Sequence, residues 1–430
     1  MAAMIEARAS GADALLLERS TQLGGSAVYS GGIILFSGTP EQTAMGIIDD
    51  PETLLADWPT MTGGDPASSW VVRYAEDNVP EVYDWLTAMG GSFWLSEEQS
   101  NGESVPRIHS TSGGGGGLVG LLSGQIPLDS VMFSVEATSL VMGSEGVEGA
   151  WVILEGTQAF IAADAVVVAT GGFLRDLSLV GWADPTLDTD ALWFSTGPHA
   201  TGSGHHMLDE LGADWLNPGA MGMYAHGVPD PHEAGEEVVL TTLAEGLWVN
   251  ADGEHFLVEP QTNSYATAAE VIAQPDHLAY AIFDADGLPN DGQIFDPLVE
   301  MGEGPSLVTI DDLLAAGTAH EADTLTALAD AAGINPDGLA LAAKGLTAPL
   351  LAVRIAPTLA KNFGGIAVDD AGQVLARGAV LPGVYAAGEL TGMAGGSLVG
   401  ADHAGSGFTG SLSAVLLSGR IAGRSAAEGP

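Results

Sequence analysis

The chain has 430 residues, of which 46% are hydrophobic, so it is long enough for a large core and for two or three domains. It carries 11 Lys and Arg against 56 Asp and Glu, a net charge of −45, and no cysteine. These values argue against partners such as nucleic acid or anionic membranes, and they exclude disulfides, thiol catalysis and thiolate metal sites. Acidic runs such as Asp49-Asp50 and Glu236-Glu237 are scattered, which favours a solvated surface adapted to high salt over a docking face for a basic partner.

The first residues predict a helix, a turn and a short buried strand. Residues 1–10 are rich in helix formers, Gly11 is a stop signal, and the apolar run 14–17 ends at Glu18. A strand that ends in an acidic residue is how a dinucleotide-binding βαβ unit holds a ribose hydroxyl. Such a unit also needs an earlier strand and a G-x-G-x-x-G turn, and neither precedes this strand. The pattern is either a chance similarity or a nucleotide-binding domain without its first strand.

Small residues follow the acidic strand end. Glycine pairs at 24–25 and 31–32 enclose Ser26 and Ser30, and the segment 23–40 carries no charge. This pattern favours a loop that approaches a cofactor closely over a flexible surface loop.

Helices are predicted over 51–95. Their expected core residues are Trp58, Trp70, Tyr74, Val82 and Trp85. Five consecutive glycines follow at 113–117. They resemble a phosphate loop but lack the Gly-Lys-Ser/Thr that completes one, so they are interpreted as a connector before a helix over 118–124.

From residue 131 the pattern changes to strands. The apolar run 165–169 is typical of a buried parallel strand, and the glycines 171–172 after it leave room for a ligand. The region 206–345 is mixed, with a hairpin expected at 252–253 and alanine-rich helices over 312–332 and 337–345. We interpret it as a second domain inserted into the first. The last section predicts a strand over 384–387 and a helix of small residues from about Ser411, suited to tight packing against a sheet.

Three motifs in this order, GGSAVYSGG, VVVATGGF and GVYAAGEL…GRIAG, resemble the flavoprotein family of fumarate reductases, succinate dehydrogenase flavoprotein subunits and 3-ketosteroid dehydrogenases. The resemblance covers almost the whole chain. It implies an α/β fold, with a Rossmann-like FAD-binding domain formed by 1–205 and 346–430 and an inserted α+β cap domain at 206–345. The first strand and glycine loop are missing from the sequence and are expected upstream of residue 1. Segments 14–17, 166–169 and 384–387 are expected to be neighbouring parallel strands, or to be separated by a gap where the missing strand belongs.

The resemblance also implies which residues contact FAD. Glu18 would accept a hydrogen bond from the adenosine ribose, and Glu389 would bind the ribityl region. The other implied contacts are small residues at strand ends and in loops, with one aromatic residue near the ring: Gly24, Gly25, Ser26, Ser30, Gly31, Gly32, Ala169, Thr170, Gly171, Gly388, Phe408 and Thr409.

The implied reaction is hydride transfer between the flavin and a carbon–carbon bond alpha–beta to a carbonyl. Fumarate reductases clamp two carboxylates and deliver a proton with arginine, but the corresponding positions hold Asn263, Lys361 and His403. The ketosteroid dehydrogenases fit better, because Tyr265 matches their tyrosine. By the same resemblance, His403 and the Gly407 backbone would polarise a ketone.

Other interpretations of these residues stay open at this point. Tyr265 and His403 can equally be structural, and His226 matches a carboxylate-binding histidine of the fumarate reductases only weakly. The remaining histidines considered are interpreted as structural polar residues rather than metal ligands: His199, His205 and His206. No metal site is expected.

The sequence therefore predicts an FAD-dependent oxidoreductase acting on a small molecule with a carbonyl or carboxylate. Its electron donor or acceptor is not identified. A truncated, non-catalytic remnant that binds FAD weakly or not at all is the alternative. No apolar run has the length of a membrane span and no export signal is visible, so a cytoplasmic location without membrane insertion is expected.

Overall fold

The computed structural model describes residues 1–97, 99, 102–262, 264–296, 308–392, 399–400 and 411–429. The chain divides into two compact units. The first unit consists of Met1–Asp184, Gly197–Met221 and Lys361–Pro430. The second, here called the inserted unit, consists of Pro185–Thr196 and Gly222–Ala360. The predicted functional division into 1–205, 206–345 and 346–430 stays a prediction. No helix in these described ranges is long and apolar enough to cross a membrane.

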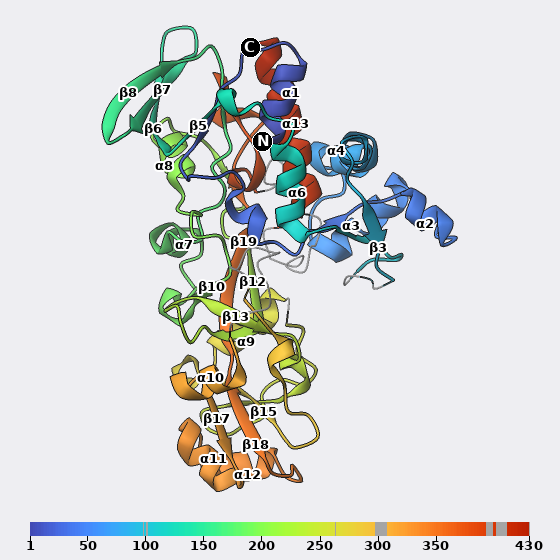
Figure 1. Cartoon of the computed structure of the whole chain (residues 1–430), viewed down its shortest axis with the longest axis vertical. Coiled ribbons are helices and arrows are strands. Elements are labelled where there is room, and N and C mark those ends of the chain that lie inside the picture. Colours follow the sequence, from blue (N-terminus) through green and yellow to red (C-terminus); the bar gives the residue numbers. More distant parts are fainter. Residues whose placement is uncertain are drawn as a thin grey trace. The chain divides into compact units, whose positions relative to one another are not determined.

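Two helices far apart in the sequence lie side by side in the first unit (Figure 1, blue and red). They are α1 (Ala2–Ala9) and α13 (Ser411–Glu428). A Cβ atom on Gly423 would collide with the backbone of Ala3, so glycine is needed for this close contact. Arg420 Nε donates to Glu6 Oε1 at 2.8 Å across the same contact. The small residues of the last helix, which the sequence suggested would pack on a sheet, thus also serve a helix–helix contact.

Two parallel strand pairs define the first unit. The strands are β1 (Leu16–Glu18) with β5 (Val131–Phe133), and β9 (Val166–Val168) with β22 (Ala379–Ala386), the latter flanked by antiparallel β21 (Gln373–Ala376). The predicted parallel pairing of 166–169 with 384–387 is confirmed, since Val166 lies opposite Val384. Direct pairing of β1 with these strands is wrong, because β1 belongs to a separate two-stranded sheet with β5. The alternative arrangement with a gap stays a prediction.

Other elements of the first unit form antiparallel sheets and helices around these pairs. The strands are β2 (Ile33–Leu35), β4 (Ile108–Thr111) and β3 (Phe93–Leu95) in one sheet, β6 (Val135–Met142), β7 (Val147–Leu154) and β8 (Thr157–Ala162) in a second, and β11 (Trp215–Leu216) with β20 (Gly365–Ile366) in a third. The helices are α2 (Pro40–Ala44), α3 (Pro51–Thr62), α4 (Ser69–Asp77), α5 (Asp84–Ala88), α6 (Gly114–Ser123), α7 (Leu177–Ala183) and α8 (Ser203–Asp209).

The helical region predicted over 51–95 is largely confirmed. A π-helix, η2 (Asn78–Tyr83), joins α4 to α5, and the helices end at Ala88, before strand β3. Trp58 and Tyr74 are fully buried and their rings lie 5.4 Å apart, as expected of core residues. Trp85 is only half-buried, under the guanidinium of Arg420.

The glycine run is helical, which corrects its interpretation as a connector. Helix α6 begins at Gly114, within the run. A Cβ atom on Gly115 would collide with the carbonyl oxygen of Ala27, and the Gly115 N–H donates to Ser30 O at 2.8 Å. Close packing against the loop therefore outweighs the poor helix propensity of glycine.

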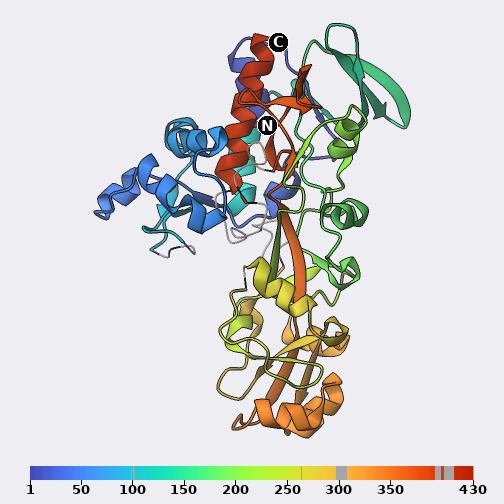
Figure 2. The ribbon, with the colours of Figure 1, turned by 180° about the vertical axis from the view of Figure 1, so that it is seen from behind.

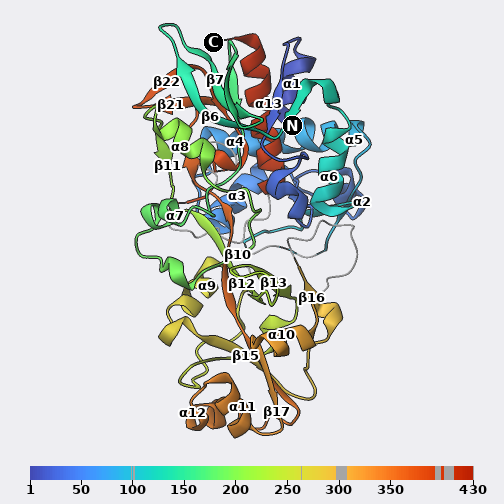
Figure 3. The same ribbon diagram turned by 60° about the vertical axis from the view of Figure 1, so that its left-hand side comes forward.

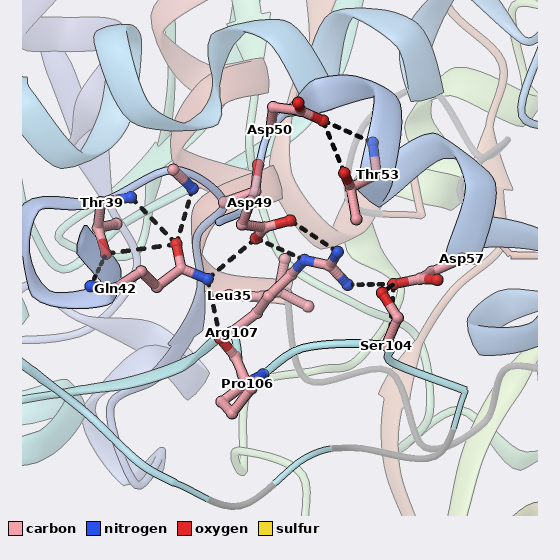
Figure 4. A network of polar contacts seen from close by, with 12 residues as sticks. Leu35, Thr39, Gln42, Asp49, Asp50, Thr53, Asp57, Ser104, Pro106 and Arg107 are labelled. Carbon is pink, nitrogen blue, oxygen red and sulfur yellow. Dashed lines mark hydrogen bonds and ion pairs between the residues drawn. The ribbon is translucent and has the colours of Figure 1, made fainter. Parts of the chain in front are cut away.

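A buried arginine joins three segments of the first unit (Figure 4). Arg107, which is fully buried, donates from Nε and Nη2 to the two oxygens of Asp49, each at 2.8 Å, and from Nη1 to Asp57 Oδ2 at 2.7 Å. Asp49 is itself buried, and Asp50 accepts a hydrogen bond from the Thr53 N–H at the start of α3. The interpretation of the acidic run as solvated surface is therefore wrong for Asp49, whereas Asp50 is exposed and caps α3.

The strands of the inserted unit run from green to orange in Figure 2, and those among the described residues form two sheets. The first has the order β10 (Trp193–Phe194), β19 (Ala356–Asn362), β12 (Met221–Pro229), β13 (Glu237–Leu240) and β16 (Ile294–Phe295). The second has the order β14 (Leu247–Asn250), β15 (Ala279–Phe283), β18 (Leu350–Arg354) and β17 (Ala319–Ala322).

Helices cover the second sheet of the inserted unit (Figure 3, orange). The helices of this unit are α9 (Tyr265–Ile272), α10 (Ile310–Ala316), α11 (Leu325–Ala332) and α12 (Pro336–Ala342). Leu328 and Leu339 bury their side chains against Val249 and Ile282 of the sheet. The single helix predicted over 312–332 is wrong, because Gly317 ends α10 in a left-handed conformation and strand β17 follows.

Candidate functional site

Residues of the first unit at the ends of β9, β19 and β22 meet at one polar cluster. Most of β19 belongs to the inserted unit, but the first unit resumes at Lys361, so Asn362 belongs to the first unit. The Asn362 N–H, at the end of β19, donates to Glu389 Oε1 at 2.8 Å, just beyond β22. The Phe173 N–H, beyond β9, donates to Asn362 Oδ1 at 2.9 Å. A Cβ atom on Gly172 would meet both Asn362 Oδ1 and, at 2.7 Å, Glu389 Oε1. The second glycine of the VVVATGG motif is therefore required for this contact.

The cluster leaves hydrogen-bonding capacity for a ligand. Burial raises the pKa of Glu389 to about 7, against the opposing effects of the Asn362 N–H and the Lys361 charge. Asn362 is fully buried, and its side-chain Nδ2 has no hydrogen-bond partner among the described residues. A carboxyl group and an unpaired amide donor at the carboxyl ends of parallel strands fit the hydroxyl groups of a nucleotide cofactor. Asn362 was not identified from the sequence, although it lies two residues before a Gly-Gly pair.

The Glu389 pKa makes stability depend on pH. The unfolded carboxyl loses its proton near 4.5, whereas the folded one keeps it to about 7, so stability falls as pH rises through that interval. We expect Glu389→Gln to stabilise the flavin-free protein by about 1–3 kcal/mol at pH 8 and to change nothing near pH 4.5. Thermal unfolding at constant salt measures this. The exposed Glu428→Gln serves as control, and an equal gain at both pH values would contradict the prediction.

Glu18 lies at the end of β1. It is half-exposed, and its Oε1 accepts from the Ser20 N–H at 2.7 Å. Ala169 and Thr170 are exposed at the end of β9. A Cβ atom on Gly204 would collide with the Thr170 hydroxyl, so α8 also packs closely here. The roles of Glu18, Ala169 and Thr170 toward FAD stay predictions.

The GGSAVYSGG segment forms a short 3-10 helix, η1 (Gly25–Tyr29), which begins at the second glycine of the first pair. Gly24 has φ 139°, and a Cβ atom on Gly32 would meet the Gly114 backbone. The glycines thus allow close packing on α6. For the residues of this segment, contacts with FAD stay predictions: Gly24, Gly25, Ser26, Ser30, Gly31 and Gly32. The same holds for Gly171 and Gly388, which lie elsewhere in the chain and have positive φ. The predicted residues Asn263, His403, Gly407, Phe408 and Thr409 lie outside the described residues.

The histidines of α8 have structural surroundings. His205 is fully buried, stacked on Trp215 and edge-on to Phe173, each at 5.0 Å, and burial lowers its pKa to about 3. His206 Nε2 lies 2.7 Å from Asp176 Oδ2. Within the described part of the chain, no group of three or more His, Asp or Glu side chains is arranged to hold a metal ion.

In the inserted unit, the segment before Tyr265 is joined to β12. The Ala225 N–H donates to Thr262 O at 2.7 Å, and Tyr265 begins α9 three residues later. On β12, the rings of Tyr224 and His226 flank Ala225 and lie 5.0 Å apart. The structure thus brings the Tyr265 and His226 segments together. The acidic pair 236–237 beside β12 is buried, so its interpretation as solvated surface is wrong.

Comparison with known proteins identifies the class. The family model of the FAD binding domain matches residues 1–407, so the chain belongs to this family. The chain is 30% identical to a fumarate reductase (cytochrome) of Shewanella frigidimarina, over 99% of this chain and 75% of that protein. It is 26% identical to a KsdD-like steroid dehydrogenase of Mycobacterium tuberculosis, over 96% of this chain and 90% of that one.

Solved structures agree on the fold. An open flavocytochrome c3 fumarate reductase matches with a TM-score of 0.77 at 24% identity, over 99% of this chain and 76% of that chain. A 3-ketosteroid Δ1-dehydrogenase of Sterolibacterium denitrificans matches with a TM-score of 0.75 at 18% identity, over 99% of this chain and 97% of that chain. The chain is an FAD-dependent oxidoreductase acting on CH–CH bonds, as the sequence predicted. The alternative of a non-catalytic remnant finds no support.

Proposed function

We propose that the chain transfers hydride between its flavin and a carbon–carbon bond next to a ketone, with Tyr265 as the group that moves the proton. Bound FAD supplies the hydride acceptor or donor. The observation that carries the proposal is the hydrogen bond from the Ala225 N–H to Thr262 O, which holds the turn before Tyr265 against β12. His403 and Gly407 are the residues proposed to polarise the ketone oxygen.

A dicarboxylate substrate is the second candidate. It is supported by the 30% identity to a fumarate reductase and by His226, which is half-buried beside Tyr224. Against it, positions 263, 361 and 403 hold Asn, Lys and His, where the resemblance to fumarate reductases leads one to expect Arg, His and Arg. The ketone is therefore preferred.

Flavin absorbance distinguishes the two candidates. Reduced holoenzyme is mixed with cyclohex-2-enone or with fumarate, and oxidised holoenzyme with cyclohexanone or with succinate. We expect the ketone pair to change the flavin spectrum faster. A faster response to fumarate or succinate would replace the ketone proposal by the dicarboxylate one. A complete redox cycle also needs an external electron donor or acceptor, for which an artificial dye serves in steady-state assays.

We also propose that the protein works in the cytoplasm of a cell with high internal salt. The net charge of −45 supports this, because repulsion among so many like charges destabilises the folded state unless dissolved ions screen it.

The unfolding temperature should therefore rise with salt. Between about 0.1 M and molar KCl the Debye length falls from ~10 Å to ~3 Å, so repulsion between surface carboxylates weakens. Differential scanning calorimetry at several KCl concentrations measures the change. An unfolding midpoint that stays flat or falls with salt would contradict the proposal.

A further inference from the structure

A fully buried carboxylate, that of Glu237, lies beside His226, a candidate substrate-binding residue of the inserted unit. Glu237 begins β13, and its side chain is inaccessible to solvent. Thr358 Oγ1, on β19, lies 2.5 Å from Glu237 Oε2 and 2.9 Å from Ala356 O. A hydroxyl has one proton to donate, and both the shorter distance and the charge favour donation to the carboxylate.

A glycine creates the space that Glu237 uses. β12 lies between β13 and β19, and Glu237 spans it to reach Thr358. A Cβ atom on Gly227 of β12 would collide with Glu237 Oε2. Gly227 has no positive φ, so its backbone does not require glycine. The missing side chain instead admits the carboxylate.

The second oxygen of Glu237 faces a histidine. Glu237 Oε1 lies 3.4 Å from Nδ1 of His226, which is an ion-pair distance, and neither atom has a hydrogen-bond partner among the described residues. The His226 side chain is 19% exposed, whereas that of Glu237 is 0% exposed. The carboxylate therefore faces the buried Nδ1, and the exposed part of the His226 side chain lies on its other atoms.

We propose that Glu237 is a positioning residue for His226. Its carboxylate keeps a proton on Nδ1 and fixes the ring, so that a second proton, taken up by Nε2 when the substrate binds, is donated in a hydrogen bond to the carbonyl or carboxylate oxygen of the substrate. This rests on the proposed function insofar as His226 contacts substrate. The physical basis is that an ionised carboxylate without water needs hydrogen-bond donors, and that the bond at one ring nitrogen sets the tautomer at the other.

The experiment compares Glu237→Gln with Glu233→Gln in the holoenzyme. Glutamine keeps the shape and an oxygen for Thr358 but removes the charge facing Nδ1, whereas Glu233 is an exposed carboxylate four residues earlier. The first readout is the ¹⁵N chemical shifts of the His226 ring nitrogens, without substrate and at a pH where histidines are neutral. The His226→Gln spectrum assigns the signals. We expect the Nδ1–H form in the parent and in Glu233→Gln, and a mixture or the Nε2–H form in Glu237→Gln.

The second readout is turnover of whichever substrate, cyclohex-2-enone or fumarate, reacts with the parent enzyme. We expect Glu237→Gln to lower kcat/KM by about 10- to 100-fold, as loss of a group that orients a functional histidine does. Gly227→Ala should lower kcat/KM to a similar extent. The Glu237 carboxylate is still present in this variant, but the new Cβ atom displaces it from His226. Calorimetry of each variant checks that the fold is kept.

The outcomes are distinct. An unchanged His226 tautomer in Glu237→Gln overturns the inference, and so does a changed tautomer with unchanged kcat/KM. If neither substrate reacts with the parent, the proposed function fails, while the ¹⁵N spectra still decide whether Glu237 sets the His226 tautomer.

Discussion

We expect Tyr265→Phe to lower turnover of a ketone substrate by about 10²–10⁴-fold, the range typical of a general acid or base. The substitution removes only the hydroxyl, so the packing of the half-buried ring at the start of α9 is kept. The flavin spectrum should not change, because Tyr265 is not among the proposed FAD contacts. The measurement is kcat with the substrate that reacts with the parent holoenzyme, at several pH values.

Tyr280→Phe is the matched control. Tyr280 is a buried tyrosine of the same unit, on β15 in the other sheet, and it has no proposed role in the reaction. Equal rates for Tyr265→Phe and the parent would contradict the assignment. The proton would then have to come from another group. A carboxylate clamp built around His226 and Arg354, whose buried Nε has no hydrogen-bond partner among the described residues, would become the leading hypothesis.

The largest effect on stability is expected for Arg107→Met. Methionine keeps an apolar stem of similar length but leaves Asp49 without its bidentate partner and Asp57 without its 2.7 Å ion pair. Breaking a buried ion pair by removing one partner typically costs about 3–5 kcal/mol, because the remaining charge stays out of water. Denaturant unfolding in high salt measures the difference.

Arg73→Met is the control for Arg107→Met. Arg73 forms a half-exposed ion pair with Asp77 one helical turn away and donates from Nη1 to Asp370 O at 2.8 Å, contacts worth together no more than about 1 kcal/mol. Adding Asp49→Leu to Arg107→Met should recover part of the lost stability, since the unpaired carboxylate is then gone. Similar losses for the Arg107 and Arg73 variants would show that the network in Figure 4 is not a major source of stability.

The sequence predicted those features that depend on local pattern. The apolar run before Gly171 gave a parallel strand, and the small residues from Ser411 gave a long helix. Ordered motifs along the chain were enough to predict the flavoprotein class.

Features that depend on long-range contacts could not be predicted in this way. Burial of Asp49 and Glu237 depends on partners that are distant in sequence. Arg107 forms an ion pair with Asp49, and Thr358 donates a hydrogen bond to Glu237. The helix at Gly114 exists because a loop far upstream packs on glycine backbone. Composition alone cannot distinguish such buried acids from the many that face solvent.

The contact between α1 and α13 constrains the order in which the protein folds as it is made. About four hundred residues separate the two helices, and ribosomes add roughly 5–20 residues per second, so α1 waits tens of seconds or more for its partner. During that time α1, whose residues Ala2, Met4 and Ala7 are buried in the finished protein, lacks the helix against which it packs. The inserted unit is a separate compact unit, and all its residues are synthesised before α13. Until α13 leaves the ribosome, the first unit is incomplete, and its uncovered apolar surface is available to holdase chaperones.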